Sequence, residues 1–199
     1  MPSARTLLLT TLTMLAFAGN SVLCRIALWE TGIDAASFTT IRLASGAVVL
    51  WLIVRGFRRA QAGGGNWLSA LMLMAGAAWG VYSIRGKGAG DATRVTAGNF
   101  LRAVPFAAVL SLLPLAEARL DAAGVAYALA SGAITSGLGY AIWYTVLPAL
   151  KATSAATVQL SVPVIAALGG IVFLGEAVTL RFVLASAAVL GGIALVILN

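Results

Sequence analysis

Long apolar runs, each of about 20 residues, follow one another along this chain and are separated by short polar connections. A run of this length is what an α-helix needs to cross the hydrocarbon core of a bilayer. Charges and turn residues divide the chain into seven runs: Thr6 to Trp29, Ala36 to Val54, Trp67 to Ile84, Ala97 to Leu115, Ala122 to Leu147, Ala152 to Leu174 and Leu180 to Leu198. The pattern predicts an all-α integral membrane protein with about seven transmembrane helices.

Composition supports lipid as the surroundings of these helices. Apolar residues make up 61% of the 199 positions and charged residues 10%, against about 45–50% and 25% in soluble domains. The formal charge is +7, but the basic residues stand singly or in small groups between the apolar runs, as in cytoplasmic loops. The sequence has no basic stripe with interleaved aromatic residues, which is the pattern expected of a nucleic-acid-binding surface. We therefore expect a multi-pass protein of the cytoplasmic (inner) membrane, with the lipid bilayer and no nucleic acid as partner.

The N-terminal segment has some features of a secretory signal, namely Arg5, an apolar run and the small residues Ala16 and Ala18. The apolar stretch continues to Arg25, however, which makes it long enough to span a membrane. We therefore expect a retained first helix.

Several kinds of chemistry are excluded by residue types that are missing. The sequence has no histidine, and its one cysteine, Cys24, lies inside an apolar run. This rules out an internal disulfide, histidine-based catalysis and a histidine metal site. No span holds a pair of carboxylates, and the last span has no lysine that could carry retinal. We expect no enzyme activity, no cofactor and no metal.

An internal repeat is visible at an offset of about 60 residues. Residues 16–21 (AFAGNS) and 38–44 (FTTIRLA) are similar to residues 77–82 (AAWGVY) and 98–103 (GNFLRA). In both copies the second segment holds a single arginine, Arg42 or Arg102, within the first two turns of the expected helix.

With this repeat the chain resembles the EamA-type drug/metabolite transporter superfamily, whose members contain two inverted repeats of five helices. The segment from Pro148 through Pro163 to Glu176 is especially similar to the ninth helix of that family and the Gly-Glu turn after it. The resemblance implies that residues 67–199 form a complete second repeat and residues 1–60 only the first two helices of the first. Residues 61–66 are the junction, and family helices three to five are missing.

The distribution of basic residues also points to a break. Seven successive crossings place six basic loop residues on the N-terminal side and five on the other, without the usual cytoplasmic excess. If an odd number of spans once separated Arg59 from Trp67, the counts become eight and three. The break is therefore predicted near residues 61–66.

Polar side chains at membrane depth need partners in the protein or a wet cavity, so they are candidates for substrate contact. Pro163 is the predicted hinge of the sixth run, with a kink that only improves packing as an equal alternative. The predicted substrate-binding residues are Asn20, Ser21, Arg42, Tyr82, Asn99, Arg102, Tyr140, Gln159 and Ser161.

Some of these candidates, and three further polar or aromatic residues, have more than one explanation. Arg42 and Arg102 either hold an anionic substrate group or tie the repeats together, or else they reach to lipid headgroups from near a helix start. An interfacial aromatic belt is the favoured explanation of Trp143 and Tyr144. A helix-end or loop role is favoured over proton coupling for Glu176.

The resemblance implies a membrane transporter that exports small metabolites or amphipathic compounds by alternating access, with the substrate held between the repeats. The alternative is an inactive or structural membrane remnant, because the missing helices would form part of the cavity wall. Their loss would leave a lateral groove that exposes Asn20, Tyr82 and Tyr140 to lipid. A homodimer would close the groove; otherwise the first two helices are expected to pack weakly on a five-helix second repeat.

Overall fold

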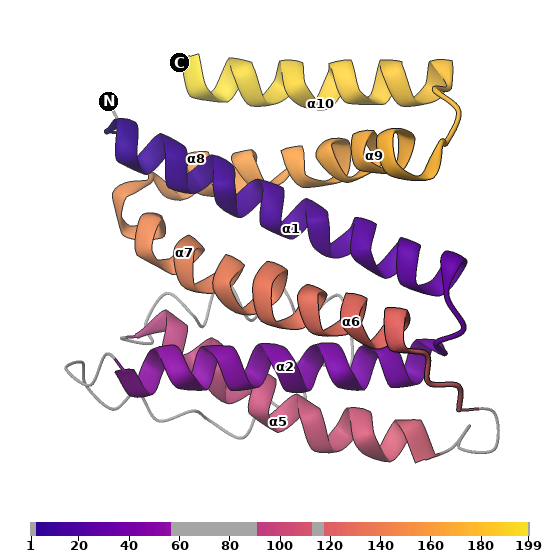
Figure 1. Ribbon diagram of the computed structural model, residues 1–199. Helices are drawn as coiled ribbons and strands as arrows, with labels where there is room; N and C mark the ends of the chain where they lie inside the picture. Colours follow the sequence, from indigo (N-terminus) through magenta and orange to yellow (C-terminus); the bar gives the residue numbers. More distant parts are fainter. Residues whose placement is uncertain (1–2, 57–90, 113–117, 199) are drawn as a thin grey trace.

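The computed structural model describes residues 3–56, 91–112 and 118–198, and all regular elements in these ranges are helical (Figure 1). The elements are α1 (Ala4–Glu30), α2 (Ala35–Gly56), α5 (Ala92–Leu112), α6 (Ala122–Ala130), the π-helix η3 (Ser131–Leu138), α7 (Gly139–Val146), the 3₁₀ turn η4 (Leu147–Ala149), α8 (Ala152–Gln159), α9 (Ser161–Leu174) and α10 (Leu180–Leu198). The expected span at 67–84, with the candidate Tyr82, lies outside the described residues.

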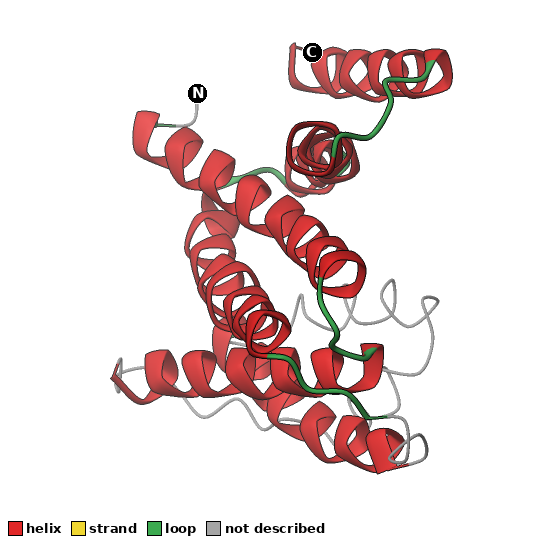
Figure 2. Ribbon diagram, turned by 45° about the vertical axis from the view of Figure 1, so that its right-hand side comes forward, coloured by secondary structure: helices red, strands yellow, loops and turns green. Residues whose placement is uncertain are grey.

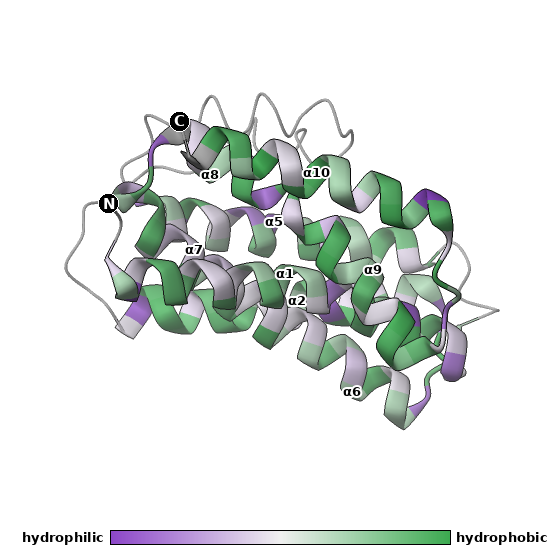
Figure 3. Ribbon diagram, turned by 90° about the horizontal axis from the view of Figure 1, so that it is seen from above, coloured by the Kyte–Doolittle hydropathy of each residue, from purple (hydrophilic) through white to green (hydrophobic). Residues whose placement is uncertain are grey.

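Within the described residues, five helical segments are long and apolar enough to cross a membrane: Ala4–Glu30, Ala35–Gly56, Ala92–Leu112, Ala122–Ala149 and Thr153–Leu174. The final helix contributes a shorter apolar stretch, Leu180–Val196. Hydrophobic residues, green in Figure 3, recur along the long helices, and strongly hydrophilic ones are few. The prediction of an all-helical, multi-pass membrane protein is confirmed in this part of the chain, whereas the number of seven helices stays a prediction.

Short polar side chains set the helix starts. Ser3 accepts a hydrogen bond from the backbone N–H of Thr6, and Asp121 accepts one from that of Gly124; these are typical N-cap contacts. Asp91 accepts from the N–H groups of two residues in the first turn of α5. This cap starts α5 at Ala92 rather than at Ala97, so the expected boundary was wrong by five residues.

The first two helices are interleaved with the rest of the bundle. Figures 1 and 2 show α10 at one edge, α2 and α5 at the other, and α1, α8–α9 and α6–α7 between them. α2 packs chiefly against α5 and η3, and α1 against α9, α7 and η3, while α1 and α2 have few contacts with each other. The expectation that these two helices pack weakly on the second repeat is therefore wrong.

The packing of α2 against α5 is antiparallel. Thr40 near the start of α2 shares a hydroxyl–hydroxyl hydrogen bond of 2.7 Å with Ser111 near the end of α5, and Gly46 contacts Phe100. The end of α2 and the start of α5 consequently lie at the same end of the bundle (Figure 1). One crossing between these two points would place them at opposite ends, so the arrangement disagrees with seven simple crossings. The predicted break near residues 61–66 lies outside the described residues and stays a prediction.

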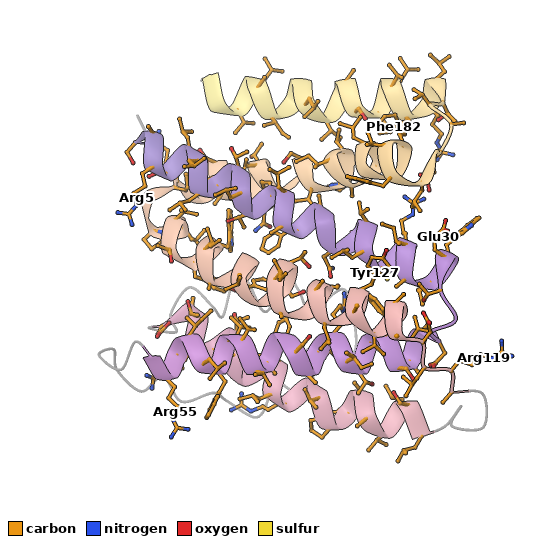
Figure 4. The ribbon with its side chains drawn as sticks, in the orientation of Figure 1. Arg5, Glu30, Arg55, Arg119, Tyr127 and Phe182 are labelled. Atoms are coloured by element: carbon orange, nitrogen blue, oxygen red, sulfur yellow. The ribbon has the colours of Figure 1, made fainter. Side chains whose placement is uncertain are left out.

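The same topology separates the described charges. Figure 4 shows Arg5 and Arg55 at one end of the bundle and Glu30 and Arg119 at the other. The first end carries Arg5, Arg55, Arg94 and Lys151 with Asp91; the second carries Arg25, Arg119 and Arg181 with Glu30, Asp34, Asp121 and Glu176. Among the described residues, the first end has four cations and one carboxylate, and the second has three cations and four carboxylates. We call them the basic end and the acidic end.

Asp34 joins two connections at the acidic end. Its carboxylate caps α2 through the N–H groups of Ala36 and Ser37 and also accepts the N–H of Arg119, at 2.9–3.0 Å. Hydrogen bonds from the Ser37 side chain and from these N–H groups lower the pKa of Asp34 from 3.8 to about 2. The ionised carboxylate thereby ties the α1–α2 loop to the segment before α6.

The topology can be tested by labelling single cysteines in a Cys24→Ser background. Gly56→Cys and Ala92→Cys should react with a membrane-impermeant maleimide from the same side of the membrane, and Arg119→Cys from the opposite side. Reaction of positions 56 and 92 from opposite sides would show that simple alternation of the spans, rather than the α2–α5 packing, sets the topology.

Candidate functional site

A polar junction joins three helices in the interior of the bundle. The Asn20 side chain on α1 accepts a hydrogen bond at its Oδ1 from Ser131 Oγ of η3 at 2.6 Å. The same oxygen accepts a long one, 3.4 Å, from Arg42 Nη1 of α2. Asn20 and Arg42 were predicted from the sequence, whereas Ser131 was missed. We call these residues the Asn20–Arg42–Ser131 junction.

The junction depends on the close approach of α2 and η3. A Cβ on Gly132 would lie 2.0 Å from both the carbonyl oxygen of Arg42 and Ser45 Oγ. A Cβ on Gly46 would lie 3.0 Å from the carbonyl oxygen of Gly132 and 2.8 Å from the Phe100 ring. Glycines permit this separation of two membrane helices, as small residues generally do.

The π-helical segment has its own internal hydrogen bonds. The carbonyl of Ser131 accepts hydrogen bonds from Thr135 Oγ1 at 2.6 Å and Ser136 Oγ at 2.9 Å. These hydroxyls satisfy a carbonyl in a stretch where the backbone departs from α-helical bonding. π-helical turns inside α-helices are rare and often mark functional positions. No pattern in the sequence predicted the π-helical geometry.

Arg42 is the eighth residue of α2, about 10 Å from the start of that helix. The side chain is half-buried, and its Nε is buried without a hydrogen-bond partner among the described residues. The guanidinium bonds Asn20 on the neighbouring helix. This contact favours a role inside the bundle over an extension to lipid headgroups.

Arg102 differs from Arg42 in position and direction. Because α5 begins at Ala92, Arg102 is its eleventh residue, about 15 Å from the helix start and deeper than the sequence indicated. Its Nη1 lies 3.4 Å from the place a Cβ on Gly98 would take. The side chain therefore runs back along α5, one turn toward the basic end.

Aromatic rings gather around Tyr140 of α7. Its ring centroid lies 5.0 Å from that of Phe17, 5.9 Å from that of Phe100 and 6.0 Å from that of Tyr144, which is stacked on it. Phe17 and Phe100 were not among the sequence candidates, since single phenylalanines in apolar runs carry no distinguishing signal. We call Phe17, Phe100, Tyr140 and Tyr144 the aromatic cluster.

The prediction that Trp143 and Tyr144 belong to an interfacial aromatic belt is wrong for Trp143 and does not fit the contacts of Tyr144. Trp143 is only 4% exposed and packs with Met14 and Val146 in a core cluster. The hydroxyl of Tyr144 accepts a hydrogen bond from Thr96 Oγ1 at 3.0 Å. Both side chains thus face other helices instead of the membrane surface.

The remaining sequence candidates are not part of the junction. Ser21 is exposed, although its neighbour Asn20 faces inward. Asn99 on α5 is buried, and its Oδ1 has no hydrogen-bond partner among the described residues. Ser161 donates to the carbonyl of Val158 at 2.7 Å, and Gln159 is half-buried at the end of α8.

The predicted interruption of the sixth run is present. α8 ends at Gln159 and α9 begins at Ser161, with Leu160 between them. Pro163 has no N–H to donate to the carbonyl of Gln159, four residues earlier, which explains an interruption at this point. Whether the break acts as a hinge stays a prediction.

At the acidic end an ion pair links α1 to the turn after α9. Arg25 Nη2 donates to Glu176 Oε1, and both side chains are partly exposed. A Cβ on Gly170 would lie 2.6 Å from Glu176 Oε2, so this glycine leaves room for the pair. Gly175 ends α9 with φ 65°, the left-handed geometry that favours glycine. Glu176 thus has a helix-end position, as expected.

The approach at Gly132 yields a prediction. Gly132→Ala should destabilise the protein by about 1–3 kcal/mol, because the added methyl group would overlap a backbone oxygen. Gly191→Ala in α10 is the matched control, since nothing lies within 4 Å of its Cβ position. Thermal unfolding in detergent measures both. Equal unfolding temperatures of the two variants would contradict the close approach of α2 and η3.

A second prediction concerns the acceptor in the junction. Asn20→Ala leaves the donors of Ser131 and Arg42 unmatched and should destabilise the protein by about 1–3 kcal/mol. Ser21→Ala, one residue away and exposed, should have no measurable effect. The same unfolding assay compares the two variants, and an Asn20→Ala protein as stable as Ser21→Ala would exclude the junction.

Comparison with known proteins gives two matches. Residues 66–198 match the EamA-like transporter family. The chain is also 42% identical to the uncharacterized protein PA1977 of Pseudomonas aeruginosa over 275 residues, covering 99% of this chain and 96% of that protein. No solved structure matches. The alignment of 275 residues exceeds the 199 residues of this chain, so at least 76 aligned residues of the relative have no counterpart here.

Proposed function

We propose that this chain, which belongs to the EamA-like transporter family, exports small metabolites or amphipathic compounds across the cytoplasmic membrane by alternating access. Membership of the family supports a transporter of small molecules rather than an enzyme. Export, the cytoplasmic membrane and alternating access are the finer parts of this proposal.

The Asn20–Arg42–Ser131 junction carries the proposal. Asn20 and Arg42 belong to the first two helices, and Ser131 lies within the matched residues 66–198. The junction therefore joins the first two helices to the matched region, and the Arg42 contact is the longer of its two hydrogen bonds. In secondary transporters, substrate sites occur near the membrane midplane between repeats, where helices are discontinuous. The π-helical segment at Ser131 is a local departure from α-helical geometry within a continuous helix, and Leu160 separates α8 from α9.

Charge supports an orientation. Cytoplasmic loops of membrane proteins carry an excess of Lys and Arg, and the end with Arg5, Arg55, Arg94 and Lys151 is the more basic one among the described residues. We infer that this end faces the cytoplasm. The aromatic cluster then lies on the cytoplasmic side of Arg42, since Phe100 contacts Gly46, one turn along α2 toward that end.

A membrane remnant without transport is the second candidate, and the missing residues favour it. The alignment covers nearly all of both proteins, so the 76 or more unmatched residues of the relative are internal. That length is enough for three spans of about 20 residues with short connections. We propose that these residues correspond to family helices three to five, between α2 and the matched region. A second copy of the chain could replace the wall they would form.

Reconstitution in liposomes separates the two candidates. Liposomes loaded with a defined mixture of amino acids and aromatic carboxylates should lose at least one compound faster than protein-free liposomes, as measured by mass spectrometry of the external solution. Release no faster than from protein-free liposomes, by protein shown to be inserted, would favour the remnant.

In the same assay, Arg42→Ala and Arg102→Ala should lower release about tenfold or more, because a hydrogen bond from a charged group contributes roughly 1.5–3 kcal/mol. Membrane insertion should remain intact, since each change removes a charge that is costly within a span. Arg55→Ala, at the exposed end of the same helix as Arg42, is the control and should release at the wild-type rate. Wild-type release and stability in both interior variants would remove the arginines from the site.

A further inference from the structure

The guanidinium of Arg42 has no carboxylate partner among the residues that the structure describes. Every Asp and Glu among the residues that the structure describes lies at a helix end or in a connection: Glu30, Asp34, Asp91, Asp121 and Glu176. The stretch from Ala35 to Gly90 contains none. Charged side chains within a span normally pair with one another or mark a substrate pathway. The countercharge of Arg42 must therefore come from outside this stretch of the chain.

Three acidic residues at the acidic end of the bundle, Asp34, Asp121 and Glu176, have other partners. Asp34 caps α2 and accepts the backbone N–H of Arg119. Glu176 pairs with Arg25, and Asp121 caps α6. None of these three contacts involves Arg42.

We propose that the substrate is a small organic anion whose carboxylate binds Arg42 and whose apolar body contacts the aromatic cluster. This inference rests on the proposed transport function and names the substrate class of the same site. A guanidinium has five N–H donors in a planar fork that matches a carboxylate. Its contact with Asn20 is long, and the Oδ1 of Asn20 has a shorter contact with Ser131.

The free donor of Arg42 is part of the argument. Nε is buried and has no hydrogen-bond partner among the described residues, a condition that costs free energy in the absence of a ligand. A carboxylate that binds side-on would accept from Nε and one terminal nitrogen together, which is the common bidentate arrangement.

The aromatic cluster determines which apolar group the substrate would carry. Phe100 contacts α2 at Gly46, one helical turn from Arg42. The Phe100 ring is followed by Tyr140 at 5.9 Å, and Tyr140 by Phe17 at 5.0 Å. Apolar surface that begins one helical turn from a cation suits a compound with a carboxylate at one end and a ring at the other.

A lipid phosphate is the rival source of negative charge, because arginine side chains near helix ends reach toward headgroups. The observed direction of Arg42 favours the soluble anion. Its Nη1 bonds Asn20, which lies ten residues before the end of α1, about 15 Å from that end.

The test is thermal unfolding of the full chain in dodecyl maltoside, a detergent without phosphate, titrated with phenylacetate or with its neutral isostere phenylacetamide. Phenylacetate should raise Tm by about 3 °C at saturating concentration, and phenylacetamide by much less. Arg42→Gln should abolish the difference between the probes. Arg55→Gln, which removes the same charge from the exposed end of α2, should retain it.

Arg42→Lys covers the case in which the Gln variant folds poorly, since lysine keeps the charge without the fork. It should retain part of the phenylacetate effect. Equal effects of the two probes on wild-type protein would overturn the proposal without any variant. A shift by dioleoyl phosphatidylglycerol alone, lost in Arg42→Gln, would assign Arg42 to a headgroup and also overturn it.

Binding and transport can fail separately in these experiments. Phenylacetate-specific stabilisation without release from liposomes would leave an anion site in a protein that does not transport. Release of uncharged compounds without phenylacetate binding would leave the transporter and remove the anion site.

Discussion

The approach of α2 to η3 at Gly132 is the contact on which the rest of the arrangement depends. The Cβ position of Gly132 lies 2.0 Å from a backbone oxygen of α2, so no larger residue fits there without movement of a helix. This approach puts Arg42 within reach of Asn20 and Ser131. On its other side α2 packs antiparallel to α5. The contact between α2 and η3 thus positions Arg42 in the interior, and the pairing of α2 with α5 places the end of α2 beside the start of α5.

Helix packing and simple alternation of the spans predict different positions for the end of α2 relative to the start of α5. Alternation of seven spans would separate Gly56 and Ala92, whereas the antiparallel pairing of α2 and α5 brings them to the same end. The buried side of α2 is shared between several neighbours: α2 packs against α5, η3 and α6, and Phe38, at 1% exposure, clusters with Ala27 and Ala128. The charge separation that results favours the same orientation.

Sequence reasoning recovered the features that depend on hydropathy and residue type. The spans at α1, α2, α6–α7, α8–α9 and α10 were predicted nearly at their observed bounds because lipid enforces long apolar runs. The start of α5 was missed because Thr93 and Arg94 are polar and resemble a loop, although the Asp91 cap makes them helical. Asn20 and Arg42 were recognisable as polar residues at depth. Ser131, Phe17 and Phe100 were not, since their importance comes from neighbours on other helices.

Contacts that change during transport should be weaker than contacts that persist. The hydrogen bonds of Asp34 and of Arg42 differ in strength in this sense. The Asp34 clamp accepts three backbone N–H groups at 2.9–3.0 Å and involves a carboxylate that stays ionised down to low pH. Arg42 by contrast holds Asn20 through one bond of 3.4 Å. A ligand that supplies a better acceptor can take the guanidinium from Asn20 while Asn20 keeps its bond to Ser131. Exchange of partners at Arg42 would then change the link between α1 and α2 without disturbing the link between α1 and η3, so ligand binding could alter the relation of the two helices of the first repeat.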